Sequence, residues 1–182
     1  MPSQETKKQL TVTLQIRELI YDVQTKTYNT AESLKASGKL KYDGAAHVMA
    51  SDDEESLYEL KRAIATAIGD AHVALSEFLA VGNTAGTFDN RLPVSIDGNP
   101  SATPPTQPTT ISVVFQFPSN YKNASFKTFG NGLHDYIVNR AAYVWYRQVV
   151  PEIAQACLAD ADAALEQVNK AMYSRKRPVR LS

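Results

Sequence analysis

The stretch HDYIVNRAAYVWYRQVVPEIAQACLADADAALEQVNKAMYSRKRP, residues 134–178, carries the strongest pattern in the chain. It lies in the last third, Phe126 to Arg180, and contains two amphipathic runs that are separated at Pro151. Proline fits the first turn of a helix, because its missing amide proton costs no hydrogen bond there. The stretch therefore predicts two packed helices followed by a basic tail.

The apolar positions of the two runs indicate how these helices pack. The first run has an apolar stripe that four aromatic residues widen beyond one face: Leu133, Ile137, Ala141, Val144, Tyr136, Tyr143, Trp145 and Tyr146. A helix that is apolar on most sides needs partners on more than one side. The second run repeats at alternating steps of four and three, which is typical of a helix packed along a neighbour: Ala154, Leu158, Ala161, Leu165, Val168 and Met172. We expect Gly130-Asn131-Gly132 to be the turn that leads into the first of these helices.

The N-terminal part changes its period at Ile16. From Leu10 to Ile16 apolar and polar residues alternate, which favours a half-buried strand, with a helix beginning at Leu10 as the competing interpretation. From about Arg17 to Lys35 the apolar spacing becomes helical, and Gly38 is expected to end that helix.

A capping-box pattern predicts the next helix. Ser51 stands at the expected cap position, and Glu54 follows three residues later to reach back towards the cap amide. One apolar face then continues for about seven turns as far as Leu79, and Gly82 stands where a left-handed C-terminal cap favours glycine.

Residues 83–109 are rich in Gly, Pro, Thr and Ser and are expected to form a long projecting loop or arm. Two β-prone runs, near 92–96 and 110–117, would form a loop-closed strand pair at its base. The sequence thus predicts a mainly α protein, a bundle of about four helices with a small β element. It predicts one domain over 1–182, with the arm at 83–109 and a basic tail at 174–182.

Composition narrows the classes of function. Nineteen basic and nineteen acidic residues cancel, so only a local patch could recognise a charged partner, and the tail is that patch. The single cysteine, Cys157, cannot form an intrachain disulfide and is expected to be a small core residue. We expect synthesis in a reducing, intracellular compartment and no signal peptide or membrane span.

Catalytic and metal-binding patterns are not evident in the sequence. His47, His72, His134 and Cys157 share no metal-ligand spacing, so we expect no metal, no cofactor and no enzyme activity. His134-Asp135 could be imagined as an acid–base pair, but adjacent helical residues point in different directions. A surface histidine near a helix start is the expected role of His134.

Two groups remain as candidates for partner contact. Three aromatic residues lie close together in the sequence and could belong to the core or to a subunit interface: Tyr143, Trp145 and Tyr146. The cationic tail either is solvated or contacts phosphates or an acidic neighbouring subunit. Its candidate contact residues are Arg175, Lys176, Arg177 and Arg180.

The strings IVNRAAYVWY, residues 137–146, and VNKAMYSRKRP, residues 168–178, resemble the C-terminal region of small structural proteins of tailed phages that infect gut Bacteroidetes. SDDEE at 51–55 before a long helix is similar to the same group. In architecture the chain resembles head-to-tail connector proteins, also called neck or adaptor proteins, which are helical, carry a projecting β loop and form rings beneath the portal. It departs from the shortest of them in its N-terminal strand and its long proline-rich loop.

The resemblance implies a protein that is made in the host cytoplasm and forms a homo-oligomeric ring in the virion neck or tail region. This ring would join the portal to the tail or to further neck proteins. DNA passing through the ring lumen is a further partner to consider. Two alternatives stay open: another tail-assembly or DNA-contacting accessory protein that uses the basic tail, and an enzyme with a concave pocket of convergent titrating groups.

Overall fold

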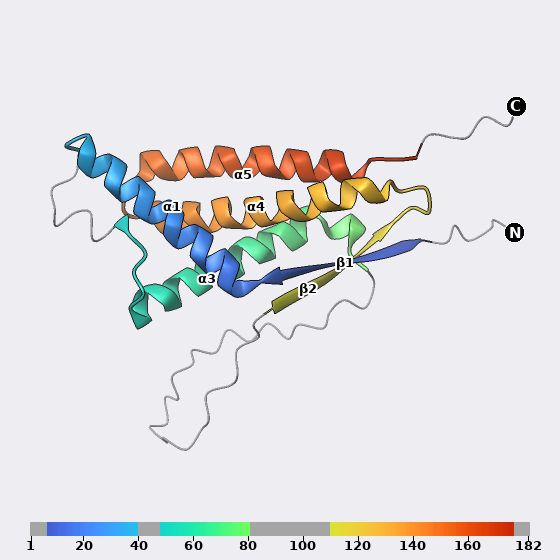
Figure 1. Cartoon of the computed structure of the whole chain (residues 1–182), viewed down its shortest axis with the longest axis horizontal. Helices are drawn as coiled ribbons and strands as arrows, with labels where there is room; N and C mark the ends of the chain where they lie inside the picture. The colour runs from blue at the N-terminus through green and yellow to red at the C-terminus, as the bar shows by residue number, and fades with distance from the viewer. Residues whose placement is uncertain (1–6, 40–47, 81–109, 177–182) are drawn as a thin grey trace, which may run out of the picture.

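In the part of the chain that the structure describes, the fold consists of four helices and a two-stranded sheet. Figure 1 shows how these elements are arranged. The structure is a computed structural model and describes residues 7–39, 48–80 and 110–176. The elements are β1 (Lys8–Gln15), α1 (Ile16–Ala36), α3 (Glu54–Ala74), η1 (Ser76–Phe78), β2 (Thr110–Phe117), η2 (Asn123–Ser125), α4 (Phe126–Tyr146) and α5 (Pro151–Met172). The prediction of a mainly helical bundle with a small β element is confirmed.

Helix α4 is the centre of the bundle. It packs antiparallel along α5, and α3 and α1 contact its other sides (Figure 1). Its buried positions are spread around the helix rather than confined to one stripe: Phe129, Gly132, Leu133, Tyr136, Ile137, Val138, Ala141, Ala142 and Tyr146. The prediction that the aromatic helix needs partners on several sides is therefore confirmed, as is Pro151 in the first turn of α5.

The sheet is a single antiparallel pair. In its register Leu10 lies opposite Phe115 and Val12 opposite Val113, so the apolar side chains of both strands face the bundle. The strand expected near 10–16 is thus confirmed against the competing helix. Leu79 forms a bridge to Phe115 on the other edge of β2. The strand expected near 92–96 and the whole arm at 83–109 lie outside the described residues.

An aromatic cluster joins the sheet to the bundle. The ring of Phe129 meets that of Phe115 edge-on with centroids 4.8 Å apart, and Tyr121 stacks on Phe117 at 4.2 Å. Phe115, Phe117, Tyr121 and Phe129 are all fully buried. These rings fix the start of α4 against β2, although the two elements are joined by a connection that is mostly polar.

The start of α3 corrects the capping prediction. Ser51 is not the cap: the helix begins at Glu54, and the Asp53 carboxylate accepts a hydrogen bond from the Ser56 amide at 2.8 Å. That hydrogen bond lowers the pKa of Asp53. The Ser51 hydroxyl bonds the Asp53 carboxylate, so it supports the cap rather than forming it.

The end of α3 and the start of α4 also differ from the prediction. Helix α3 ends at Ala74, because the chain turns at the buried Leu75 and carries Leu79 to the sheet. Helix α4 begins at Phe126, so Gly130-Asn131-Gly132 is helical rather than a turn. Gly132 lies against α5, where a Cβ would be only 2.9 Å from Cγ2 of Val168. A close helix–helix contact, and no turn, accounts for this glycine.

The end of α1 follows the prediction. Gly38 has a φ of 69°, a left-handed conformation that glycine adopts without strain, and it directly follows the last turn of α1. Among the described helices none is both long and apolar enough to cross a membrane.

Candidate assembly surfaces

The aromatic group at the end of α4 is divided between core and surface. Tyr146 is fully buried, whereas Tyr143 and Trp145 are half-buried and pack against the core. The indole of Trp145 donates a hydrogen bond to the Val48 carbonyl at 3.0 Å, and the Arg140 guanidinium lies 5.0 Å from the centre of the Tyr143 ring. Tyr143 and Trp145 therefore keep an accessible side, and Tyr146 belongs to the chain's own core.

The buried hydroxyl of Tyr146 has no hydrogen-bond partner among the described residues. Burial raises the pKa of Tyr146 to about 12, and the nearby Thr30 offsets only part of this rise. No contact of ordinary hydrogen-bond geometry joins the hydroxyl to Thr30. The ring at this position packs in the core. Because the pKa of the buried hydroxyl is raised, the folded state loses stability relative to the unfolded chain at high pH.

A groove of about 540 Å³ lies between the start of α3 and the end of α4, and we call it the loop-end groove. Its apolar lining includes Met49, Val144, Trp145 and Val149, and the Val149 side chain is 43 % exposed. Charged residues of both signs line the same groove: Glu55, Glu59, Arg62 and Arg147. The lining thus mixes apolar with charged and polar side chains, a composition found at the polar rim of protein interfaces.

Apolar side chains are also exposed at the other end of the bundle, next to the sheet. Val73, in the last turn of α3, is 77 % exposed, and Tyr173, just after α5, is 58 % exposed. The Tyr173 ring meets the half-buried Phe78 edge-on at 5.5 Å. We call Val73, Phe78 and Tyr173 the sheet-end residues. Glu55 in the loop-end groove and Val73 are 18 residues apart on α3, which is about 27 Å along the helix axis.

The basic tail begins as an anchored segment. Arg175 forms a bridge to Tyr121, and the Lys176 amide donates to the Asn120 carbonyl at 2.8 Å. The guanidinium of Arg175 folds back and donates to the Met172 carbonyl at 2.7 Å, so it caps α5. The guanidinium of Arg175, which the sequence placed in the contacting tail, is therefore held against the end of α5. Lys176 is exposed, and Arg177 and Arg180 lie outside the described residues.

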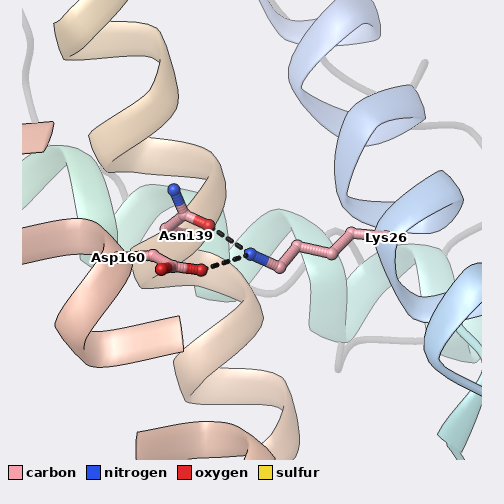
Figure 2. A network of polar contacts seen from close by, with 3 residues as sticks. All are labelled: Lys26, Asn139 and Asp160. Atoms are coloured by element: carbon pink, nitrogen blue, oxygen red, sulfur yellow. Dashed lines mark hydrogen bonds and ion pairs between the residues drawn. The ribbon is translucent and has the colours of Figure 1, made fainter. Parts of the chain in front are cut away.

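A polar cluster ties α1 to α4 and α5, and Figure 2 shows its three members. The ammonium group of Lys26 on α1 reaches between the other two helices, where it bonds the Asn139 side chain and lies 3.4 Å from the Asp160 carboxylate. Lys26 is 30 % exposed and Asp160 is 64 % exposed. One flexible side chain thus connects three helices.

A second contact joins α1 to α4 one turn away. Nε2 of His134 lies 2.7 Å from the Asp22 carboxylate, and both residues line an open groove of about 700 Å³ between the two helices. The partner of His134 is therefore Asp22 and not the adjacent Asp135.

Cys157 on α5 is buried, as expected, and burial raises the pKa of its thiol.

Sequence reasoning missed the contacts of Lys26 and Asp22 because their partners lie more than a hundred residues away. The available signal was the spacing of Asp22 and Lys26, which are one turn apart beside the buried stripe of α1. Within residues 7–39, 48–80 and 110–176, no three His, Cys, Asp or Glu side chains are placed to hold a metal ion.

The fold and these surfaces define a small helical-bundle protein whose central helix is covered on three sides. Comparison with protein-family models, curated proteins and solved structures gives no match to the chain.

Proposed function

We propose that this chain is a structural subunit of a phage head-to-tail connector, which associates head to tail into a ring between the portal and the tail. The proposal combines the resemblance of residues 137–146 and 168–178 to phage structural proteins with the distribution of exposed apolar side chains. Its role would be structural, since the subunit binds its neighbours and transfers no chemical group.

One observation carries the proposal: two unlike surfaces lie at the two ends of the bundle, a groove of mixed polar and apolar lining at one end and exposed apolar side chains at the other. The loop-end groove is concave and contains Trp145 and Val149, whereas the sheet-end residues Val73 and Tyr173 are strongly exposed. A contact between two different surfaces is heterologous, and it closes into a ring when the rotation between neighbours allows it. The separation of the surfaces along α3 lets one copy offer each end to a different neighbour.

The arrangement of the helices also suits a subunit that must keep its shape between two neighbours. Helix α4 is covered by three other helices, and the polar contacts of Lys26 and Arg140 link it to α1 and α3. A subunit held together in this way would present its two end surfaces at a fixed separation.

The alternative of DNA contact now depends on Lys176 and on residues 177–182, because Arg175 caps α5.

A binding experiment with the portal protein encoded in the same phage genome tests the proposal. Tagged wild-type chain is expected to retain the portal, or the adjacent tail protein, on an affinity resin. Val149→Asp is expected to reduce this retention about tenfold or more, because a charge then lies on an apolar interface. Ala65→Asp, at an exposed position of α3 that does not line the groove, is the control for surface charge alone. Failure of the wild-type chain to retain either protein would contradict the proposal.

A further inference from the structure

Helix α1 carries a stripe of side chains that the end surfaces do not include. Its members follow one another at steps of four, three, four and four residues, so they lie within about 80° of one another around the helix. They are Arg17, Tyr21, Gln24, Tyr28 and Glu32. Four of them are exposed, and Gln24 is half-buried. We call these five residues the tyrosine stripe. The buried face of α1 consists of Leu19, Val23, Thr27 and Ala31 and borders the stripe on the side of Gln24. The Gln24 amide donates there to the Ser51 carbonyl and to the Asp52 carboxylate.

The two tyrosines make this stripe unusual for a surface. Tyr21 is 63 % exposed and Tyr28 is 51 % exposed, and the two are among the few large apolar side chains exposed in the described residues. They are seven residues apart, which places them two turns and about 10 Å from each other on one side of α1. Tyrosine is enriched in protein interfaces because it combines a large apolar ring with a polar tip.

The charges at the two ends of the stripe identify the partner. Arg17 lies one turn before Tyr21, and Glu32 lies one turn after Tyr28, so the stripe runs from a cation through two tyrosines to an anion. The same stripe reversed runs from an anion through two tyrosines to a cation. A second copy of α1 laid antiparallel on the first therefore brings Arg17 of each copy towards Glu32 of the other. Lys35 lies five turns after Arg17 on the same side of α1 and shares that end with Glu32.

The register of this pairing follows from the numbering. In the register that we consider, Arg17 faces Glu32 of the second copy and Tyr21 faces Tyr28 of the second copy. The numbers of any two facing residues then add up to 49. The two-fold axis then passes between Gln24 and Thr25. Glu32 already pairs with Lys35 of its own helix at 3.3 Å, and a carboxylate has acceptor capacity for both cations.

We propose that two copies of this chain associate through an antiparallel, two-fold contact between their tyrosine stripes. Such a contact is isologous, because each copy uses the same surface. The proposal does not rest on the connector function, since it uses α1 and neither end of the bundle.

Charge exchange between the ends of the stripe tests the register. Wild-type chain is expected to show concentration-dependent dimers in sedimentation velocity. Arg17→Glu alone and Glu32→Arg alone place like charges opposite each other twice per dimer, so each should raise the dimer Kd about tenfold. An equimolar mixture of the two variants should recover the wild-type Kd as a heterodimer, because each of the two end pairs then joins a carboxylate of one variant to a guanidinium of the other.

Glu18→Arg is the matched control. It changes the net charge as Glu32→Arg does, but Glu18 is exposed beside the stripe rather than on it. Its dimer Kd should equal that of the wild type, and circular dichroism should confirm that all variants fold. A wild-type chain that stays monomeric at every concentration would overturn the proposal. So would a mixture that fails to recover dimers, or an effect of Glu18→Arg equal to that of Glu32→Arg. A chain that forms this dimer but does not bind the portal protein would contradict the connector function. It would not contradict the contact between the tyrosine stripes.

Discussion

Among single residues, Tyr146 has the clearest consequence for stability. Its phenol has a pKa of about 12 in the folded chain, raised from the ordinary value of 10.0 by burial. Above pH 10 the unfolded chain loses this proton and the folded chain keeps it. The stabilising contribution is therefore complete below pH 10 and is lost as the pH rises to about 12, at a total cost of roughly 2–3 kcal/mol.

Tyr146→Phe should reduce this alkaline loss. The variant is expected to lose roughly 1 kcal/mol less of its free energy of unfolding than the wild type between pH 7 and pH 11, as measured by urea denaturation. At pH 7 the substitution should be close to neutral, because the hydroxyl it removes has no partner among the described residues. Tyr58→Phe, at a half-buried position outside both proposed contact surfaces, controls for loss of another phenol. Equal alkaline losses in wild type and Tyr146→Phe would show that this residue is not the source.

The ion pair between Arg140 and Asp70 is a second prediction at this scale. Nε of Arg140 lies 2.7 Å from the Asp70 carboxylate, and the side chains are only 27 % and 36 % exposed. Asp70→Asn should lower the free energy of unfolding by about 1 kcal/mol. Glu166→Gln, which breaks a strongly exposed pair with Lys170 within α5, should change it little. Thermal denaturation of both variants measures the two losses in the free energy of unfolding. Equal losses in Asp70→Asn and Glu166→Gln would contradict the prediction.

Residue identity alone predicted some of these roles and missed others. Cys157 was predicted to be buried because small apolar neighbours surround it in the sequence, and it is. The cap of α3 was assigned to Ser51, although Ser51, Asp52 and Asp53 can all cap a helix. Only the backbone geometry selects Asp53, since local hydrogen bonds of similar strength compete at adjacent positions.

Among the elements, α4 and α5 make the closest contact, and Gly132 is the residue that permits it. Gly132→Ala would place a methyl group 2.9 Å from Cγ2 of the buried Val168, whose branched side chain has little freedom to move. We expect a loss of roughly 1–3 kcal/mol in the free energy of unfolding. Gly130→Ala, one half-turn away with no atom near the added methyl, should instead gain roughly 0.5–1 kcal/mol. Equal effects in chemical denaturation would mean that α4 and α5 are farther apart here.

The attachment of α1 gives a prediction about local opening. Lys26→Met keeps most of the side-chain length but removes its bonds to Asn139 and Asp160. Hydrogen exchange in residues 16–36 should become faster, while exchange within α5 stays unchanged. Lys170→Met, at an exposed position of α5, is the control. Unchanged exchange in α1 would show that apolar packing alone holds this helix.

Elements were more predictable than their boundaries. The periods of residues 133–146 and 151–172 predicted α4 and α5 because a buried helical face must repeat at three to four residues. The same signal extended α3 to Leu79, since apolar spacing cannot reveal that Leu79 packs on β2. Gly130 and Gly132 suggested a turn, because a glycine required by a neighbouring helix looks the same in sequence as one required by a turn.

For the whole molecule, head-to-tail association predicts a distinctive result from mixing variants. Val149→Asp disables the loop-end groove, and Val73→Asp disables the sheet end, so each variant keeps one intact surface. Under assembly conditions each variant alone should fail to form rings. Their mixture should form complexes that join the two variants once and do not grow into rings. Rings formed by either variant alone would exclude these surfaces.

At this scale the sequence predicted the fold class but not the surfaces. A helical bundle with a small sheet followed from periodicity, whereas the loop-end groove depends on how α3 and α4 end beside each other. Trp145 could be identified as a candidate contact because it is a large aromatic residue among others. Val149 and Val73 could not, since a single exposed valine has no signature in sequence.

The mass of the native assembly tests the connector function most directly. Native mass spectrometry of the purified chain, alone and with the portal protein of the same phage, gives the number of copies in each complex. We predict a portal-bound complex whose mass corresponds to a closed ring of this chain. A chain that remains a strict monomer, and that ignores portal and tail proteins under all conditions, would contradict this account.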